Sequence, residues 1–338
     1  MSLRRLVAAA LIPLALLASA CGGGEGESFG DDSLVIYSGR NENLVGPLIE
    51  KLRTATGLDV QVRYGDSAEL AAQILEEGAD TRADLFFSQD AGALGALSKH
   101  RMLAPIAPAA LDRVPAEYRG SDGTWVGLSG RSRVIVYDPR TVTAPPKSVF
   151  ELTDPRWQGK VGWAPTNASF QSFVTALRVL SGEDRARQWL EAMKANGTQT
   201  FSNNVNILNA VDEGKLQLGL INHYYWYEKV AERGANGVPS RLAYLPGGDP
   251  GALVNVAGVG VLKDSEHAAA AHKAVDFLLG TEAQKYFADT TKEYPLISGV
   301  ATAAGLPPFD SLKGPEVDLS KLDSIEQTIT LLQEVGLV

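Results

Sequence analysis

Residues 34–52, LVIYSGRNENLVGPLIEKL, decide the fold class, because the apolar pattern changes its period at a glycine. Residues 34–38 form a short apolar run that is typical of a buried strand, and Gly39 follows as a turn residue. After Gly39, apolar residues recur at three- and four-residue spacing, which predicts an amphipathic helix. These residues are Leu44, Leu48, Ile49 and Leu52. The segment is therefore expected to form a strand, a turn and a helix.

The same alternation continues along the chain. Residues 60–64 alternate as a second strand, Asp66 or Ser67 begins a second helix, and residues 85–87 make a third strand. Strands that alternate with helices predict a parallel, doubly wound α/β sheet, in which ligands lie beyond the carboxyl ends of the strands. The sites expected there are 38–42 and 88–90.

Strand and helix patterns recur after the first sheet, so we predict two doubly wound α/β lobes joined by hinge strands. A strand at 133–137 leads into the second lobe, and a strand at 257–262 with a helix at 267–279 returns to the first. The expected division is as follows. Lobe one comprises 34–130 and 255–305, and lobe two comprises 131–254 and 306–338.

The N-terminus has the pattern of a bacterial secretory signal. Arg4 and Arg5 precede the apolar run 6–17, which is too short to span a bilayer comfortably. Small residues then lead to Cys21, the only cysteine, and to a glycine-rich stretch. We predict a signal peptide at 1–20, lipidation of Cys21 and a flexible tether at 21–33, which makes the protein extracytoplasmic and lipid-anchored to the cell membrane.

Charge and cysteine content exclude several classes of function. The formal charge of −9 becomes −11 once Arg4 and Arg5 are removed, which argues against nucleic acid or anionic lipid as the main partner. A single cysteine allows neither an intramolecular disulfide nor a thiolate metal site. About 310 residues after the tether suit two lobes, since single cores stop growing near about 250 to 300 residues.

The run INHYYWY, residues 221–227, places two tyrosines side by side between a strand at 216–221 and a helix. A phenolate is a hard anionic oxygen donor with a pKa of about 10, so only an acidic cation such as iron(III) displaces its proton at neutral pH. Tyr224 and Tyr225 are therefore candidate iron ligands. An aromatic cluster that packs into the core or stacks on a ligand is the alternative.

Other polar residues fall near the expected cleft. Asn167, Ala168 and Ser169 precede a helix at 170–180, whose N-terminus offers free N–H groups to an anion, although a simple helix cap fits equally. Asn204 and Asn222 are further candidate donors. Tyr137 is either a third phenol ligand or an ordinary strand tyrosine. His223 is expected to turn away from the neighbouring tyrosines, and Tyr227 is expected to pack. Arg131 and Arg133 either offset the negative charge of an anion or of phenolates, or are solvated cations.

Within residues 34–338, which we expect to form the two lobes, the sequence contains no Gly-x-Ser-x-Gly, Walker-type or two-histidine metal motif. We therefore expect a binding protein and no enzyme. A secreted hydrolase would require a catalytic pair that spacing does not reveal.

Several motifs together resemble the bacterial iron(III)-binding solute-binding proteins of ABC importers, which have the class II periplasmic-binding-protein fold. The resemblance extends from about residue 34 to residue 338. The motifs that carry it are 35–40, 76–86, 128–134, 221–226, 249–254 and 293–296.

The resemblance implies roles for individual residues. The two adjacent iron ligands of the family fall on Tyr224 and Tyr225, and in one branch a further tyrosine falls on Tyr137. The loop that seats a synergistic carbonate or phosphate falls on Asn167, Ala168 and Ser169, supported by Asn204 and Asn222. Where the best-known branch has a first-lobe histidine and glutamate, this chain has Asn41 and Gln89 beside Arg40 and Glu42. An anion, water or chelator completes the shell there, or Glu42 reaches in.

The function expected from the resemblance is capture of ferric iron, with delivery to an ABC permease and its ATPase by a monomeric binding protein. The alternative is a solute-binding protein of the same fold for an organic cation such as a polyamine or thiamine, stacked on Trp226, Tyr225 and Tyr227.

Overall fold

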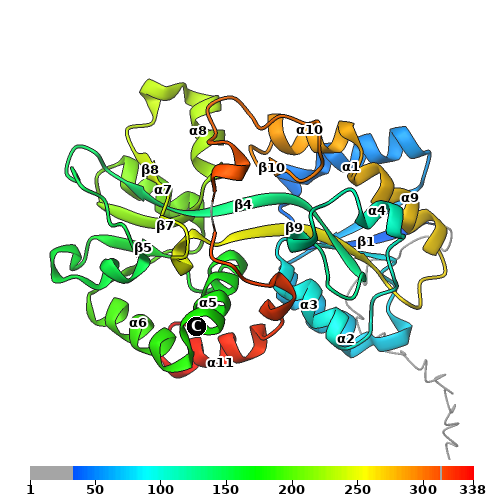
Figure 1. Ribbon diagram of the computed structural model, residues 1–338, viewed down its shortest axis with the longest axis horizontal. Helices are drawn as coiled ribbons and strands as arrows, with labels where there is room; N and C mark the ends of the chain where they lie inside the picture. Colours follow the sequence, from blue (N-terminus) through cyan, green and yellow to red (C-terminus); the bar gives the residue numbers. More distant parts are fainter. Residues whose placement is uncertain (1–32, 313) are drawn as a thin grey trace, which may run out of the picture.

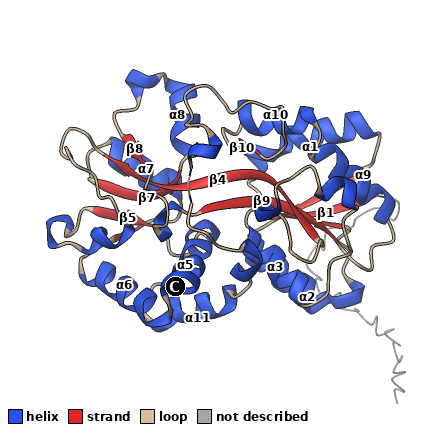
Figure 2. Cartoon of the chain, viewed as in Figure 1, coloured by secondary structure: helices blue, strands red, loops and turns tan. Residues whose placement is uncertain are grey.

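The structure is a computed structural model that describes residues 33–312 and 314–338. The expected signal peptide, Cys21 and nearly all of the tether lie outside the described residues. One curled mixed sheet runs through two α/β lobes in the order β2-β1-β3-β9-β4-β7-β5-β6, and β8 and β10 also pair with β4 (Figures 1 and 2). Helices cover both faces of the sheet in each lobe.

The first lobe begins with the predicted strand–helix alternation. Its elements are β1 (Leu34–Ser38), α1 (Glu42–Thr56), β2 (Val60–Tyr64), α2 (Ser67–Glu77), β3 (Leu85–Ser88), α3 (Ala91–Lys99) and α4 (Pro108–Leu111). β1 lies between β2 and β3 and is parallel to both, as predicted. Because the first helices start at side-chain caps, Asn41 and Asp66 among them, the turns after β1 and β2 are fixed locally.

Two long strands connect the lobes. β4 (Trp125–Tyr137) pairs with β9 (Val254–Val261) through residues 125–132 and with β7 through residues 133–137, so one strand belongs to both lobes. β9 is antiparallel to both β3 and β4. The expectation of a parallel sheet therefore holds for β1 to β3 but not for β9 and β4, because β9 enters the sheet from the opposite lobe.

The second lobe repeats the alternation around β7. Its elements are β5 (Val161–Trp163), α5 (Ala168–Ser181), α6 (Glu183–Ala195), β6 (Gln199–Thr200), α7 (Asn204–Asp212), β7 (Leu218–Asn222), α8 (Tyr224–Arg233) and β8 (Arg241–Ala243). After β9, the chain adds α9 (Ala268–Leu278), α10 (Thr281–Asp289) and β10 (Tyr294–Pro295) to the first lobe, and then crosses again to α11 (Ile325–Glu334), which lies against α5.

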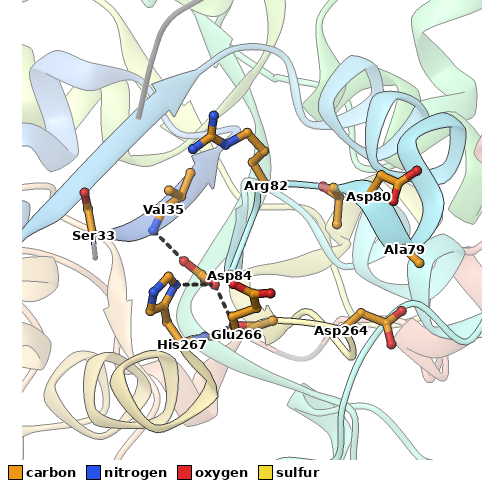
Figure 3. A pocket seen from close by; sticks show the side chains of 11 residues that line it. Ser33, Val35, Ala79, Asp80, Arg82, Asp84, Asp264, Glu266 and His267 are labelled. Carbon is orange, nitrogen blue, oxygen red and sulfur yellow. Dashed lines mark hydrogen bonds and ion pairs between the residues drawn. The ribbon is translucent and has the colours of Figure 1, made fainter. Parts of the chain in front are cut away.

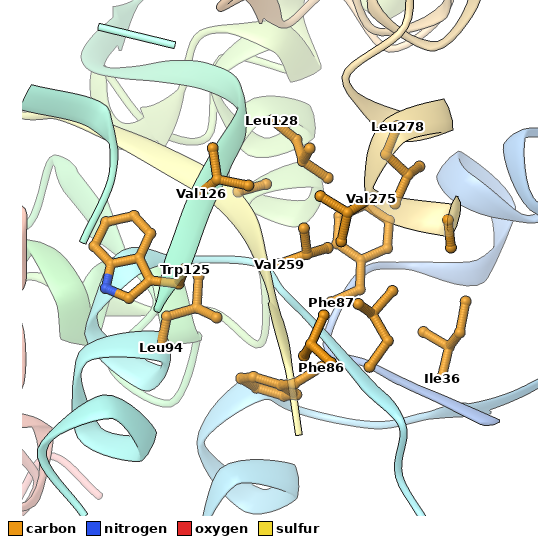
Figure 4. Close-up of a cluster of buried hydrophobic side chains, with 14 of the residues drawn as sticks. Ile36, Phe86, Phe87, Leu94, Trp125, Val126, Leu128, Val259, Val275 and Leu278 are labelled. Carbon is orange, nitrogen blue, oxygen red and sulfur yellow. The ribbon is translucent and has the colours of Figure 1, made fainter. Parts of the chain in front are cut away.

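Each lobe has its own core. In the first lobe, fully buried side chains from β1, β3, β4 and β9 pack together (Figure 4). The second core is rich in aromatic rings, with edge contacts among Trp163, Phe170, Phe173 and Trp189. Leu319 and Leu322 lie in the segment 306–338, which we expected in lobe two, yet they pack on the first core.

No helix within residues 33–312 and 314–338 combines the length and the apolar character that crossing a bilayer requires.

Gly258 lies opposite Gly127 where β9 pairs with β4 beside a register shift, and an added Cβ there would come within 2.6 Å of the Val126 carbonyl oxygen. We expect Gly258→Ala to lower the free energy of unfolding by about 1–3 kcal/mol, because backbone must move to relieve the clash. Gly46→Ala is the control, since its Cβ meets nothing closer than 3.9 Å in α1 and should raise stability by about 0.5–1 kcal/mol. Urea unfolding measures the free energy of unfolding of both variants, and equal stability of the two would contradict the clash proposed at Gly258.

Candidate functional site

Tyr224 and Tyr225 are the first two residues of α8, directly after the turn that ends β7. Their ring centroids are 4.2 Å apart and the rings are inclined by 37°, so the two phenols run side by side. Tyr224 is 1% exposed and Tyr225 is half-buried. The predicted position of the pair at a strand-to-helix turn is therefore confirmed, and the tyrosines are partly core and partly accessible.

A buried group of charges lies next to the pair. Arg40, which follows β1, donates from Nη2 to Glu293 Oε2 at 2.7 Å, and Thr291 Oγ1 donates to the same oxygen at 2.9 Å. Arg131 Nε lies 3.7 Å from Glu293 Oε1. Burial alone would raise the pKa of Glu293, but the two guanidinium groups outweigh it and hold this pKa below its ordinary value.

Both phenols are neutral in the free protein. Burial raises the pKa of Tyr224, although Arg131 and Arg40 oppose the shift. Burial raises the pKa of Tyr225 well above its ordinary value, and the charge of an ionised Tyr224 would raise it further. Only a ligand that exchanges for protons can ionise this pair at neutral pH.

The five residues expected to hold an anion lie together. Asn167 caps α5, and its Oδ1 accepts hydrogen bonds from Ser169 N and Oγ at 3.2 and 2.6 Å and from Asn204 Nδ2 at 3.1 Å. Asn204 Oδ1 in turn accepts from Asn222 N at 3.2 Å. Ala168 is the first residue of α5. The cap that the sequence suggested for Asn167 is thus present, and it also orients the polar groups around it.

Arg133 lies in the same cluster without a carboxylate partner among the described residues. Its Nη1 donates to Ser169 Oγ at 3.3 Å and its Nη2 to Leu220 O at 3.4 Å, whereas its buried Nε has no hydrogen-bond partner there. The guanidinium also lies over the rings of Phe170 and Phe173. Burial lowers the pKa of Arg133 to about 9, so it is still a cation at neutral pH. Arg131 and Arg133 are both buried, which excludes the solvated-cation alternative.

The space between these groups is small. A cavity of about 10 Å³ is lined by Arg131, Arg133, Ser169, Asn222, Leu253 and Asn255. That volume holds about one water molecule. A polyatomic anion can therefore enter only if the lobes separate or side chains move.

The structure separates the first-lobe candidates. Arg40 reaches the tyrosines, but Asn41 is exposed and its side chain accepts from Asn43 N as the cap of α1. Glu42 is exposed and lies near Tyr64. Gln89 is half-buried after β3, with its backbone N–H bonded to Ser67 Oγ.

Tyr137 does not join the pair. In the register of β4 and β7, Tyr137 lies opposite Leu218 at the start of β7, whereas Tyr224 follows the end of that strand at Asn222. Four residues of strand separate the two positions by roughly 13 Å. Tyr137 instead packs against the core of the second lobe.

The aromatic side chains proposed for an organic cation present no common ring face, because Trp226 and Tyr227 meet edge-on, with ring centroids 5.0 Å apart and planes at 88°. Trp226 donates from Nε1 to Ser240 O at 3.1 Å and packs in the second lobe, beside Tyr225. Tyr227 packs against Tyr294 and Leu306, as expected for a packing residue. A stacking cage for a polyamine or thiamine is therefore not favoured.

His223 holds the turn before the tyrosines. Its Nδ1 accepts from Ser132 N at 3.2 Å, and its Nε2 donates to Lys292 O at 3.0 Å. The ring stacks on Tyr294 with centroids 4.8 Å apart. Burial lowers the pKa of His223 to about 4, so the imidazole is neutral and structural, and both nitrogens are engaged.

Sequence reasoning missed Glu228, which lies one helical turn after the tyrosines on α8. Its Oε1 is buried and has no hydrogen-bond partner among the described residues. Burial, followed by the negative charge of Glu293, raises the pKa of Glu228 to about 8. The spacing of three and four residues from the tyrosine pair was the signal that could have identified it.

A separate cavity of about 370 Å³ lies at the opposite, amino-terminal edge of β1 and β3 (Figure 3). Its central carboxylate, Asp84, is fully engaged: it accepts from Val35 N at 2.8 Å and Ser265 Oγ at 2.6 Å, with His267 Nδ1 at 3.3 Å. These contacts connect β1 to the start of α9, so the buried carboxylate of Asp84 has a structural role.

His223 predicts a specific pH dependence of stability. Its folded-state pKa of about 4 lies below the ordinary 6.5, so the unfolded chain binds the proton more readily. The stabilising effect is complete above pH 6.5 and is lost as the pH falls toward 4, by about 3 kcal/mol. We expect His223→Gln to lose this component of acid destabilisation, whereas His100→Gln, at an exposed site, keeps it. Urea unfolding at several pH values measures the difference, and identical slopes in both variants would refute the assignment.

Comparisons with known proteins show the family of this chain. The model of the bacterial extracellular solute-binding protein family matches residues 80–313. The Fe(3+)-binding periplasmic protein of Serratia marcescens is 34% identical, over 99% of this chain and 100% of the relative.

Two solved structures are similar along most of the chain. Iron-bound HitA from Pseudomonas aeruginosa is 36% identical with a TM-score of 0.85, and the match covers 90% of this chain and 99% of that one. A Trichodesmium protein (IdiA, FutA) in complex with iron and citrate is 28% identical with a TM-score of 0.77, covering 90% and 100%. These relatives are binding proteins and not enzymes, as we expected for this chain. This protein belongs to the family of bacterial extracellular solute-binding proteins.

Proposed function

We propose that this protein captures ferric iron between its two lobes for import by an ABC transporter. The observation that carries the proposal is the pair Tyr224 and Tyr225, two adjacent phenols that begin α8 beside a buried group of arginines. The names of the relatives support the same cargo, since they are described as ferric-iron-binding or iron-bound proteins.

The donor chemistry favours a trivalent metal. The described residues contain no group of three or more His, Cys, Asp or Glu side chains placed to hold a metal ion. A metal at this site must therefore be bound largely by the phenols, whose protons it displaces. Iron(III) is acidic enough to do so and prefers hard anionic oxygen, whereas calcium and magnesium bind carboxylates, carbonyls and water.

We also propose that an anion binds together with the metal at Asn167, Ala168, Ser169, Asn204 and Asn222. A buried cation without a carboxylate partner is costly, and Arg133 is such a cation in this cluster. Carbonate or phosphate would supply the opposite charge, and the polar side chains that Asn167 orients, Ser169 and Asn204, could turn to donate hydrogen bonds to it. The citrate in the Trichodesmium structure makes a carboxylate a further candidate anion.

Binding requires the lobes to move. Because the cavity at the site holds about one water molecule, we propose that the lobes open around β4 and β9, with divisions at 130/131 and 254/255 and a last crossing between Leu322 and α11, and close over metal and anion. The closed form would be recognised by the permease, and its ATPase would drive import. We propose that the protein acts as a monomer, held at the cell membrane through lipidated Cys21.

Tyr224→Phe and Tyr225→Phe test the metal site. Each change removes one phenolate, so we expect iron affinity to fall by at least about 100-fold. The visible phenolate-to-iron absorption should also weaken in each variant. Tyr227→Phe is the control, since Tyr227 packs away from the pair. Competition with a chelator of known iron affinity gives the constants, and a colourless wild-type protein that retains no iron after desalting would refute the function.

Arg133→Gln tests the anion site. The change removes the buried counter-charge, so we expect the carbonate or phosphate requirement for tight iron binding to weaken by about 10- to 100-fold. Arg233→Gln, at an exposed position on α8, is the matched control. Iron titrations with and without added anion measure the coupling. An anion dependence that is unchanged in Arg133→Gln would show that the anion binds elsewhere.

A further inference from the structure

We propose that Glu228 is a third protein ligand of the ferric ion, so that α8 alone supplies two phenolates and a carboxylate. This inference rests on the proposed function, because it assigns a further donor to the same iron site.

Helix geometry places Glu228 over the tyrosine pair. Glu228 follows Tyr224 by four residues and Tyr225 by three in α8, and residues at these spacings are neighbours on one helix face. Side chains in a helix tilt toward its N-terminus, which directs the Glu228 carboxylate toward the end of α8 where the phenols lie. The negative charge of Glu228 is close enough to Tyr225 to raise the pKa of that phenol.

The carboxylate also has an unused oxygen. Glu228 Oε1 is inaccessible to solvent and accepts no hydrogen bond from the described residues. A buried oxygen without a partner costs about 1–3 kcal/mol, more when it is charged, so its presence beside paired phenols requires an explanation. A metal ion that binds there supplies the missing partner.

An ion pair across the lobes would be the simpler explanation, but the cations near Glu228 are engaged with other groups. Arg40 and Lys292 are the two that act on Glu228. Arg40 is bonded to Glu293 at 2.7 Å, and Lys292 Nζ donates to the carbonyl oxygen of Asp289. Glu228 therefore forms an ion pair with neither of them.

Other carboxylates near the pair are less suited to bind iron. Glu293 Oε2 is bonded to Arg40, and Oε1, which accepts no hydrogen bond from the described residues, lies 3.7 Å from Arg131 Nε and is paired in charge with it. Glu42 is exposed and lies near Tyr64, and Asn41 and Gln89 are neutral amides that iron(III) binds poorly. Among these side chains, Glu228 is the buried carboxyl group that has an oxygen without a hydrogen bond and forms no ion pair with the neighbouring cations Arg40 and Lys292.

The test compares Glu228→Gln with Glu232→Gln. Both changes replace a carboxyl group on α8 by an amide of the same size, but Glu232 is exposed one turn further along. Each variant and the wild type are titrated with ferric citrate at neutral pH, and iron affinity is measured by chelator competition. The visible spectrum of the iron-loaded protein reports the ligand set directly. Thermal unfolding without metal confirms that the variants fold.

If Glu228 binds iron, Glu228→Gln lowers iron affinity by at least about 10- to 100-fold relative to Glu232→Gln. The phenolate-to-iron band also moves to longer wavelength, because loss of an anionic donor makes the ion a stronger electron acceptor. Glu228→Asp should recover part of the affinity.

Two results would overturn the inference. If the wild type binds iron and the two glutamine variants match in affinity and spectrum, Glu228 is not a ligand and the proposed function stands. If the wild type binds no iron, the proposed function and this inference both fail.

Discussion

The contact of Arg40 and Arg131 with Glu293 is the constraint on which the site depends. Three segments distant in sequence meet there: the turn after β1, the middle of β4 and the residues before β10. All three side chains are almost completely buried, and breaking such a group by removing one partner costs about 3–5 kcal/mol. The ion group therefore fixes where the long strand β4 passes the first lobe, and with it the position of the buried charges next to Tyr224.

The same charges couple lobe closure to ligand binding. Arg133 is a buried cation without a carboxylate partner among the described residues, and Glu228 has a buried oxygen without a donor. If the lobes close around water alone, Arg133 keeps no opposite charge and the Glu228 oxygen keeps no partner, which disfavours the empty closed form. An anion beside Arg133 and a metal beside Glu228 would remove both penalties at once. Differential stabilisation of the closed form is what a binding protein needs for a transporter to distinguish loaded from empty.

The sequence predicted what depends on local pattern. The alternation of strands and helices identified the fold, and the position of Tyr224 between a strand and a helix placed the pair correctly, because both follow from periodicity. Asn167, Ser169 and Asn204 were candidates for one anion site because of a helix N-terminus and loop asparagines, and the family resemblance assigned them the same role. The direction of β9 and the return of Leu319 to the first core could not be predicted, since pairing between distant segments leaves no local signature.

Tyr137 and Glu228 show the same distinction within the site. Tyr137 was placed near the cleft because it ends a strand, but the register of β4 against β7 decides which end of the second lobe it reaches. A strand end can lie at either edge of a sheet, so its place at the end of a strand does not by itself bring Tyr137 to the cleft. Glu228 was overlooked although helix spacing ties it firmly to the tyrosines, and what marks it as functional is the absence of a partner in three dimensions. A polar group that the fold buries without satisfying indicates a ligand more reliably than residue type does.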